Sequence, residues 1–369
     1  SPMIMKKVFF TLLIVSLFTV SKKAFAQLSY YEVRGKVIDK NTGAPLQGAS
    51  VFAQNTTFGE ATDVNGNFKL KIPEGGYSLI VTFTGYETGN IRISNSEPHD
   101  SLLFELSPQV KSLEEVSVVL SSEVKDGWQK YGDFFTRNFI GQSKFAKQCV
   151  IKNPEVLHFY FSKKKNRLKV LAKGPLLVEN DALGYNLKFT IDSFTNEYNT
   201  NTSLFIGYPL FEEMQGTPEQ QQTWKANRSE AYKGSMLQLM RSIFNKTMEE
   251  DGFELQFVVD NNNKEMPLKV SNFYGALNYD KDDSTNTVEI IPNQNEVAII
   301  YNNARPEQAY IDADTPAKKD FQLSTLTFAP GESIVIEKNG YYYDQTDITI
   351  NGYLAFKKIG DMLPYDYAE

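Results

Sequence analysis

Residues 33–86 read VRGKVIDKNTGAPLQGASVFAQNTTFGEATDVNGNFKLKIPEGGYSLIVTFTGY, and this stretch decides the fold at the front of the chain. Apolar residues alternate with polar ones in four short runs, near Val37, Val51, Leu70 and Val81. A period of two is typical of strands with one buried face. Turns rich in Gly and Asn separate the runs, and this spacing predicts a small antiparallel β-sandwich.

The dipeptide Asn65-Gly66 lies between two of the alternating runs. A type I′ hairpin turn needs positive φ at both central residues, which Asn and Gly tolerate better than other residues do. We therefore predict a tight hairpin at this position.

The same stretch resembles the carboxypeptidase-regulatory-like (transthyretin-like) domain family. The resemblance rests on V-x-G-x-V-x-D-x-x-T-G-x-P-L-x-G-A-x-V from Val33 to Val51, on T-D-x-x-G-x-F-x-L from Thr62 to Leu70, and on Gly85-Tyr86. It implies a seven-stranded sandwich without catalytic residues of its own, which we assign to residues 27–107. Bacteria of the Bacteroidota type place such domains at the front of outer-membrane receptors and other envelope proteins.

Residues 108–125 are interpreted as a linker. Within them, residues 113–120 (LEEVSVVL) resemble the run that joins this domain to the plug of TonB-dependent receptors. We expect the residues that follow to be too few for both a plug and a large barrel. The run is either an ordered linker or final strand of this chain, or a strand that adds to the sheet edge of a neighbour.

Residues 1–26 have the features of a secretory signal peptide. Lys6 and Lys7 precede a short apolar run over residues 8–20, and a cleavage site of the A-x-A type follows at residues 24–26. The run is shorter than the roughly 20 residues of a membrane-spanning helix, so we expect no transmembrane helix in the mature chain. The sequence therefore predicts an exported protein, periplasmic or associated with the outer membrane, that begins at Gln27.

The charge of the chain argues against nucleic acid as a partner. The formal net charge is −7, and the signal segment carries four lysines and no acidic residue, which leaves −11 (−7 less 4) for the mature chain. Dispersed negative charge repels phosphate backbones. The single cysteine, Cys149, cannot form an internal disulfide, and we interpret it as a small apolar residue.

Residues 126–369 are predicted to form a strand-rich α+β region, so that the whole chain is mainly β. Aromatic residues at helical spacing predict a short helix over residues 126–139, capped by Asp126. One long helix is predicted over residues 218–248. Short alternating runs before and after this helix predict the strands.

Four residues of the long helix are candidates for an interaction or structural role: Trp224, Arg228, Tyr232 and Arg241. The segment W-x-x-x-R-x-x-A-Y-x-G-S that contains three of them resembles uncharacterised Bacteroidota proteins with the same front domain. That resemblance implies no activity. We expect the two arginines to pair with buried carboxylates rather than to bind a ligand.

The sequence offers no recognisable catalytic motif. A zinc peptidase needs at least two well-spaced histidine or acidic ligands, and neither His99 nor His158 has one at the required offset. Both histidines are interpreted as ordinary surface or edge residues. A catalytic Ser elbow, a P-loop and a dinucleotide fingerprint are absent from the sequence. We therefore expect no catalytic residue, no metal and no cofactor, although a pair of scattered carboxylates would leave no local motif.

Three functions remain open at this stage. The first is a non-catalytic binding or scaffolding subunit of the cell envelope, whose partner is an outer-membrane β-barrel protein or complex for nutrient uptake, assembly or secretion. The second is a soluble periplasmic or surface protein that binds a glycan or peptide through its many Tyr and Phe residues. The third is a hydrolase with scattered acids.

Overall fold

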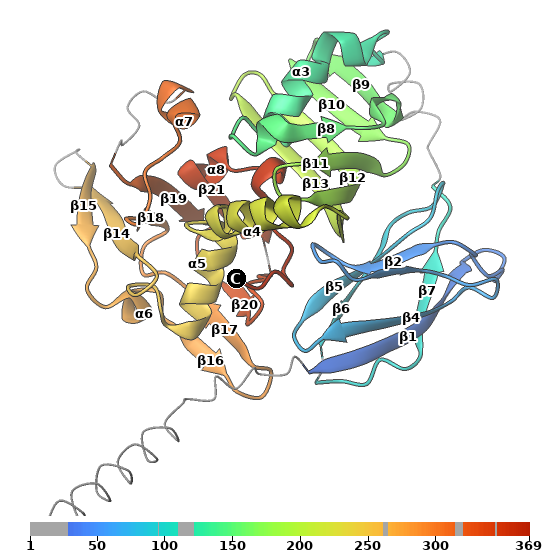
Figure 1. Cartoon of the computed structure of the whole chain (residues 1–369), viewed down its shortest axis with the longest axis horizontal. Helices are drawn as coiled ribbons and strands as arrows, with labels where there is room; N and C mark the ends of the chain where they lie inside the picture. Colours follow the sequence, from blue (N-terminus) through green and yellow to red (C-terminus); the bar gives the residue numbers. More distant parts are fainter. Residues whose placement is uncertain (1–28, 95, 110–121, 261–264, 314–319, 344) are drawn as a thin grey trace, which may run out of the picture.

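The structure is a computed structural model that describes residues 29–94, 96–109, 122–260, 265–313, 320–343 and 345–369. Three hydrophobic cores organise these residues, one in the front sandwich and two in the region behind it. Figure 1 shows the sandwich in blue, the second unit in green and the third in orange and red. The predicted signal peptide and residues 113–120 lie outside the described residues.

The front unit is a sandwich of two sheets with strand orders β4-β1-β7 and β3-β2-β5-β6. Its strands are β1 (Tyr30–Asp39), β2 (Ser50–Ala53), β3 (Gly59–Ala61), β4 (Asn67–Pro73), β5 (Tyr77–Thr82), β6 (Gly89–Ile93) and β7 (Leu102–Leu106). The alternation seen in the sequence points Phe68, Leu70 and Ile72 of β4 inward, where they are buried. The seven predicted strands are confirmed.

The turn at Asn65-Gly66 is not the predicted hairpin. It joins β3 to β4, which belong to different sheets, so the chain crosses from one layer to the other. Only Gly66 has a positive φ, and the Asp63 carboxylate accepts hydrogen bonds from the N–H groups of Asn65 and Asn67. An Asx-type turn of this kind satisfies the backbone without pairing the flanking strands.

The second unit is a six-stranded sheet with the order β8-β11-β12-β10-β9, and β13 lies along β12. Its strands are β8 (Cys149–Ile151), β9 (Leu157–Ser162), β10 (Arg167–Ala172), β11 (Leu176–Asn180), β12 (Tyr185–Glu197) and β13 (Thr202–Glu213), with short 3₁₀ turns η1 (Ala146–Gln148) and η2 (Pro154–Val156). Helix α3 (Gly127–Phe139) covers one face, as predicted. Its rings pack on the sheet, and the ring of Phe139 lies edge-to-face with that of Phe189 at 4.9 Å. Asp126 precedes the helix in the left-handed conformation, and its side chain does not form the predicted cap.

The predicted long helix is two helices, α4 (Pro218–Tyr232) and α5 (Met236–Asn245). The break lies at Gly234, whose φ is +73° and whose missing side chain leaves room for Gln322 and Tyr301. Ser235 then caps α5 by accepting the N–H of Gln238. One apolar stripe continues across the break, which explains why the sequence pattern resembles a single helix.

The third unit packs α5 against two sheets, β15-β14-β18-β19-β21 and β16-β17-β20. The remaining elements are β14 (Phe253–Asp260), β15 (Glu265–Lys269), α6 (Phe273–Ala276), β16 (Asp280–Asp282), β17 (Thr287–Ile290), β18 (Glu296–Tyr301), α7 (Gln308–Ala313), β19 (Gln322–Phe328), β20 (Ile334–Glu337), η3 (Gln345–Asp347), β21 (Ile348–Gly352), α8 (Tyr353–Phe356) and η4 (Ile359–Asp361). Strands β15, β16 and β19 were not predicted.

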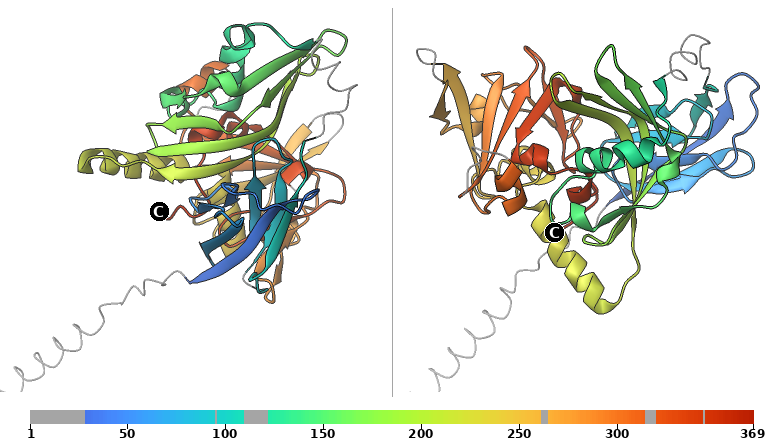
Figure 2. Two further views of the ribbon diagram at one scale, coloured as in Figure 1. Left: turned by 90° about the vertical axis from the view of Figure 1, so that its right-hand side faces the viewer. Right: turned by 90° about the horizontal axis from the view of Figure 1, so that it is seen from above.

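The mainly β fold, with a seven-stranded sandwich followed by a strand-rich α+β region, is confirmed. Figures 1 and 2 show the sandwich beside both units of that region, which we call the body. Helix α4 crosses between the second and third units. The C-terminal end of the chain lies at the surface, where Ala368 and Glu369 are exposed.

Candidate functional site

The C-terminal tail (residues 364–369) lies where the sandwich meets the body. The Tyr365 N–H donates to the Asn55 carbonyl of the sandwich over 2.7 Å. The Asp366 carboxylate accepts the N–H of Thr57 (2.9 Å) and the Thr57 hydroxyl (2.5 Å). Burial raises the pKa of Asp366, and the bonds from Thr57 oppose that shift. The end of the chain therefore joins the sandwich to the body.

Two of the four candidate residues hold this tail from the body side. The Arg241 guanidinium donates through Nη2 to the carbonyls of Tyr365 and Tyr367, both over 3.0 Å, and through Nε to the Asn339 carbonyl over 2.9 Å. The ring of Tyr232 lies 5.5 Å from that of Tyr367. Among the described residues, Arg241 thus binds three backbone carbonyls and forms no ion pair with a carboxylate.

The other two candidates fix α4 on the second unit. Trp224 Nε1 donates to the Asp181 carbonyl over 2.8 Å. Arg228 donates to the carbonyls of Leu183 (2.7 Å) and Gly184 (3.0 Å), and its guanidinium lies 3.9 Å from the centre of the Tyr185 ring. These contacts satisfy carbonyls of the turn before β12, of which the Gly184 carbonyl also accepts the Met214 N–H over 3.0 Å.

The expected pairing of both arginines with buried carboxylates is wrong. Arg228 contacts one carboxylate, that of Glu213, at 3.1 Å, but the Glu213 side chain is 60% exposed. Backbone carbonyls at the turns are the principal acceptors instead. A sequence pattern cannot show such carbonyls, because they belong to segments distant along the chain.

Glu337, at the end of β20, is a second junction between the sandwich and the body. Its side chain is 5% exposed. The carboxylate accepts the N–H of Gly76 (3.2 Å) and the Tyr343 hydroxyl (2.8 Å), and Arg92 lies 3.5 Å away. Burial raises the pKa of Glu337, and the three donors partly oppose that shift.

The contact at Glu337 leaves no spare room on the sandwich side. A Cβ atom on Gly76 would lie 2.0 Å from Glu337 Oε1. Nearby, the hydroxyls of Ser78 and Tyr341 are hydrogen-bonded over 2.9 Å. At the exposed rim, the Thr88 hydroxyl reaches Asp192 of β12 at 3.4 Å. These contacts between the sandwich and the body are polar.

A cavity of about 800 Å³ lies between the sandwich, α5 and the tail. Aromatic residues line it from both sides, with Tyr30, Phe58 and Tyr77 from the sandwich and Tyr367 from the tail. A second cavity, of about 600 Å³, lies on the other side of the tail beside Trp224 and Arg228. The tail separates the two.

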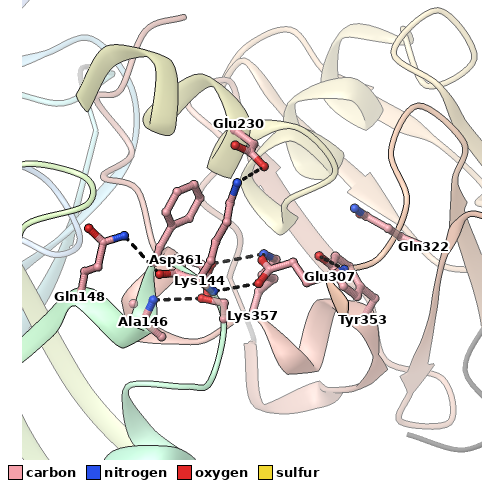
Figure 3. A network of polar contacts seen from close by, with 12 residues as sticks. Lys144, Ala146, Gln148, Glu230, Glu307, Gln322, Tyr353, Lys357 and Asp361 are labelled. Carbon is pink, nitrogen blue, oxygen red and sulfur yellow. Dashed lines mark hydrogen bonds and ion pairs between the residues drawn. The ribbon is translucent and has the colours of Figure 1, made fainter. Parts of the chain in front are cut away.

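A cluster of charged side chains joins the second unit to the third, as Figure 3 shows. Lys357 is paired with Glu307 and, at 3.3 Å, with Asp361, while the Lys144 backbone N–H donates to Glu307 over 2.8 Å. Burial alone would lower the pKa of Lys357, but Asp361 and Glu307 raise it above its usual value. The lysine therefore stays charged and bridges the two units.

The histidines and the cysteine have structural surroundings. His99, which the sequence predicted at the surface, is buried, and its Nε2 lies 2.8 Å from the Ser94 carbonyl oxygen. His158 Nδ1 is 2.8 Å from Glu123. Burial raises the pKa of the Cys149 thiol to about 12, which disfavours the reactive thiolate. Within the part of the chain that the structure describes, His, Cys, Asp and Glu residues form no group suited to a metal ion.

Residues 33–118 match the family model of the CarboxypepD_reg-like domain. The chain carries a CarboxypepD_reg-like domain at its front. This confirms the resemblance given by the sequence, and it covers the sandwich but not the body. The helices of the described ranges include none that is long and apolar enough to cross a membrane.

Two curated relatives match about a third of the chain. The TonB-dependent receptor SusC of Bacteroides thetaiotaomicron is 34% identical over 114 residues, and the TonB-dependent receptor P39 of Formosa agariphila is 29% identical over 117 residues. These matches cover 31% and 32% of this chain, and the chain spans only 10% of the length of either receptor.

A solved structure of a DUF3823 family protein from Parabacteroides merdae is also similar. It shares 9% identity, and the match covers 53% of this chain and 86% of that protein, with a TM-score of 0.19.

Proposed function

We propose that this chain is a non-catalytic binding or scaffolding subunit of the cell envelope that associates with an outer-membrane β-barrel complex. The observation that carries the proposal is the CarboxypepD_reg-like domain, and the similarity of about a third of the chain to two TonB-dependent receptors supports it. In this chain the domain is seated on a body of its own, with hydrogen bonds at Glu337 and Asp366.

The sandwich keeps a surface that a partner can use. In the described residues, β7 is hydrogen-bonded to a strand on one side only, which makes it the edge of its sheet. Leu103 on this strand is 53% exposed. An exposed strand edge with an apolar side chain is a suitable template for pairing with another chain.

The non-catalytic assignment is part of the same proposal. The two carboxylates at the junction, Glu337 and Asp366, are each engaged by donors of this chain. Such groups are suited to holding protein segments together rather than to proton transfer on a substrate.

The test is affinity purification of the tagged chain from detergent-solubilised outer membranes. We expect a β-barrel protein to co-purify, and we expect Leu103→Asp to reduce its recovery. Leu204→Asp, at a residue of the body that is 61% exposed, is the matched control and should leave recovery unchanged. Recovery of the chain alone, from the soluble periplasmic fraction, contradicts the proposal.

A further inference from the structure

The cavity between the sandwich and the body has the size and position of a ligand site. Its volume of about 800 Å³ falls within the range of known pockets, and such pockets occur preferentially where two domains meet. Its walls belong to units with separate hydrophobic cores. The cavity is also independent of the β7 edge, so its role goes beyond association with a barrel.

Aromatic rings form much of the cavity surface. The ring of Tyr30, a residue that is 42% exposed, packs edge-to-face with Phe58 at 6.4 Å. Lys71 Nζ lies 5.4 Å from the centre of the Tyr30 ring, so an ammonium group already occupies a position over this ring. Ring faces in a partly dehydrated site attract cations.

The charged groups of the lining are mostly negative. Four carboxylates line the cavity, from Glu74, Asp283, Glu337 and Asp366, against two cations, Arg241 and Lys338. Arg241 is already committed to backbone carbonyls of the tail and of the β20 turn, and Glu337 and Asp366 are engaged by donors of this chain. The exposed carboxylates of Glu74 and Asp283 therefore face one remaining cation of the lining, Lys338. The field in the cavity therefore favours a positively charged ligand.

The polar residues of the lining can form hydrogen bonds with the backbone of a bound peptide as well as with its charged groups. The turn between β16 and β17 contributes the exposed residues Ser284, Thr285 and Asn286. Hydroxyl and amide groups of this kind pair with the N–H and C=O groups of a peptide. Carboxylates at Glu74 and Asp283 stand on opposite walls, one on the sandwich and one on the body.

We propose that this cavity binds a segment of polypeptide that carries basic side chains. The aromatic rings contact the side-chain stems, the carboxylates of the two walls pair with the charged ends, and the β16–β17 turn binds the backbone. Because both walls take part, the bound segment also contacts the sandwich and the body at once.

The proposal is tested by fluorescence anisotropy with the chain of residues 27–369 and a labelled hexapeptide of alternating Lys and Ala. We expect saturable binding that weakens as salt is added, because exposed charge pairs are screened. The double variant Glu74→Gln/Asp283→Asn should weaken it about fivefold, since exposed charge pairs each contribute modestly. Glu155→Gln, at an exposed residue of the second unit, is the control and should bind like the wild type.

Three results would overturn the proposal. The first is no saturable binding, and the second is equal binding by the wild type and the double variant. The third is displacement of the labelled peptide by maltohexaose, which would assign the cavity to a carbohydrate. Since the assay contains no barrel protein, its outcome does not depend on the co-purification experiment.

Discussion

Replacing Gly76 with alanine tests whether Glu337 holds the sandwich on the body. The new Cβ atom would lie 2.0 Å from Glu337 Oε1 and 2.5 Å from the Tyr343 hydroxyl oxygen. Real Cβ atoms do not approach so closely, so the carboxylate has to move. When it moves, it loses the hydrogen bond from the Gly76 N–H.

The size of the effect follows from two contributions. A hydrogen bond to a charged group contributes about 1.5–3 kcal/mol, and overpacking a buried contact costs about 1–3 kcal/mol. Part of the loss is recovered, because Glu337 can turn toward Arg92, whose side chain is 53% exposed. We therefore expect a loss of roughly 2 kcal/mol of docking free energy.

Gly174→Ala is the matched control. A Cβ atom there meets nothing within 4 Å. Both substitutions reduce the conformational entropy of the unfolded chain in the same way, so their difference reports the contact alone. The core of the sandwich does not include Gly76, and it should stay folded in the variant.

The assay combines urea unfolding with small-angle X-ray scattering. For Gly76→Ala we expect an early transition and a larger radius of gyration, as the sandwich leaves the body. Adding Glu337→Ala should cost less in the Gly76→Ala background than in the wild type, because the two residues are in contact. If Gly76→Ala unfolds and scatters like Gly174→Ala, the reasoning about this junction is refuted.

Three further predictions concern the same interfaces. Burial raises the pKa of Glu337, so its contribution to the folding free energy is largest in acid and is lost as pH rises through that raised pKa. In urea titrations over this pH range, the unfolding free energy of the wild type should therefore fall relative to that of Glu337→Gln. Arg241→Met removes the donors to the tail carbonyls, and hydrogen exchange should speed up there but stay unchanged in Arg137→Met, an exposed control on α3. Gly234→Ala should lower the unfolding free energy by roughly 1–3 kcal/mol more than Gly331→Ala. Both glycines have positive φ, but only Gly234 is crowded, so equal losses by chemical denaturation would contradict the packing argument.

The sequence predicted those elements that depend on residues close to one another along the chain. Alternation and turn residues predicted the sandwich, and ring spacing predicted α3. The break between α4 and α5 was missed because apolar residues recur at helical spacing in the sequence on both sides of it. The need for glycine at position 234 comes from contacts with Gln322 and Tyr301, which are distant along the chain. Strand β19 has the required alternation in Gln322–Phe328, so a stricter reading of the pattern would have found it.

The sequence could not predict which side chains join the units, because their burial depends on segments that are distant along the chain. In the run Ile334–Glu337, an outward-facing acid at the end of a strand looks like an ordinary surface residue. It is buried only because the sandwich, more than 200 residues earlier, covers it. By contrast, the aromatic and arginine pattern of α4 and α5 did identify side chains at the junction, although their partners turned out to be carbonyls.

The polar character of the junction limits how a barrel protein can engage this chain. Interfaces between domains that rest on a few hydrogen bonds permit relative motion more readily than apolar ones. A partner can contact the β7 edge and leave the docked arrangement intact, or it can compete with Glu337 and the tail for the docking face. In the first case Gly76→Ala leaves the affinity for the partner unchanged. In the second it strengthens binding about 30-fold, because roughly 2 kcal/mol of competing docking free energy is removed.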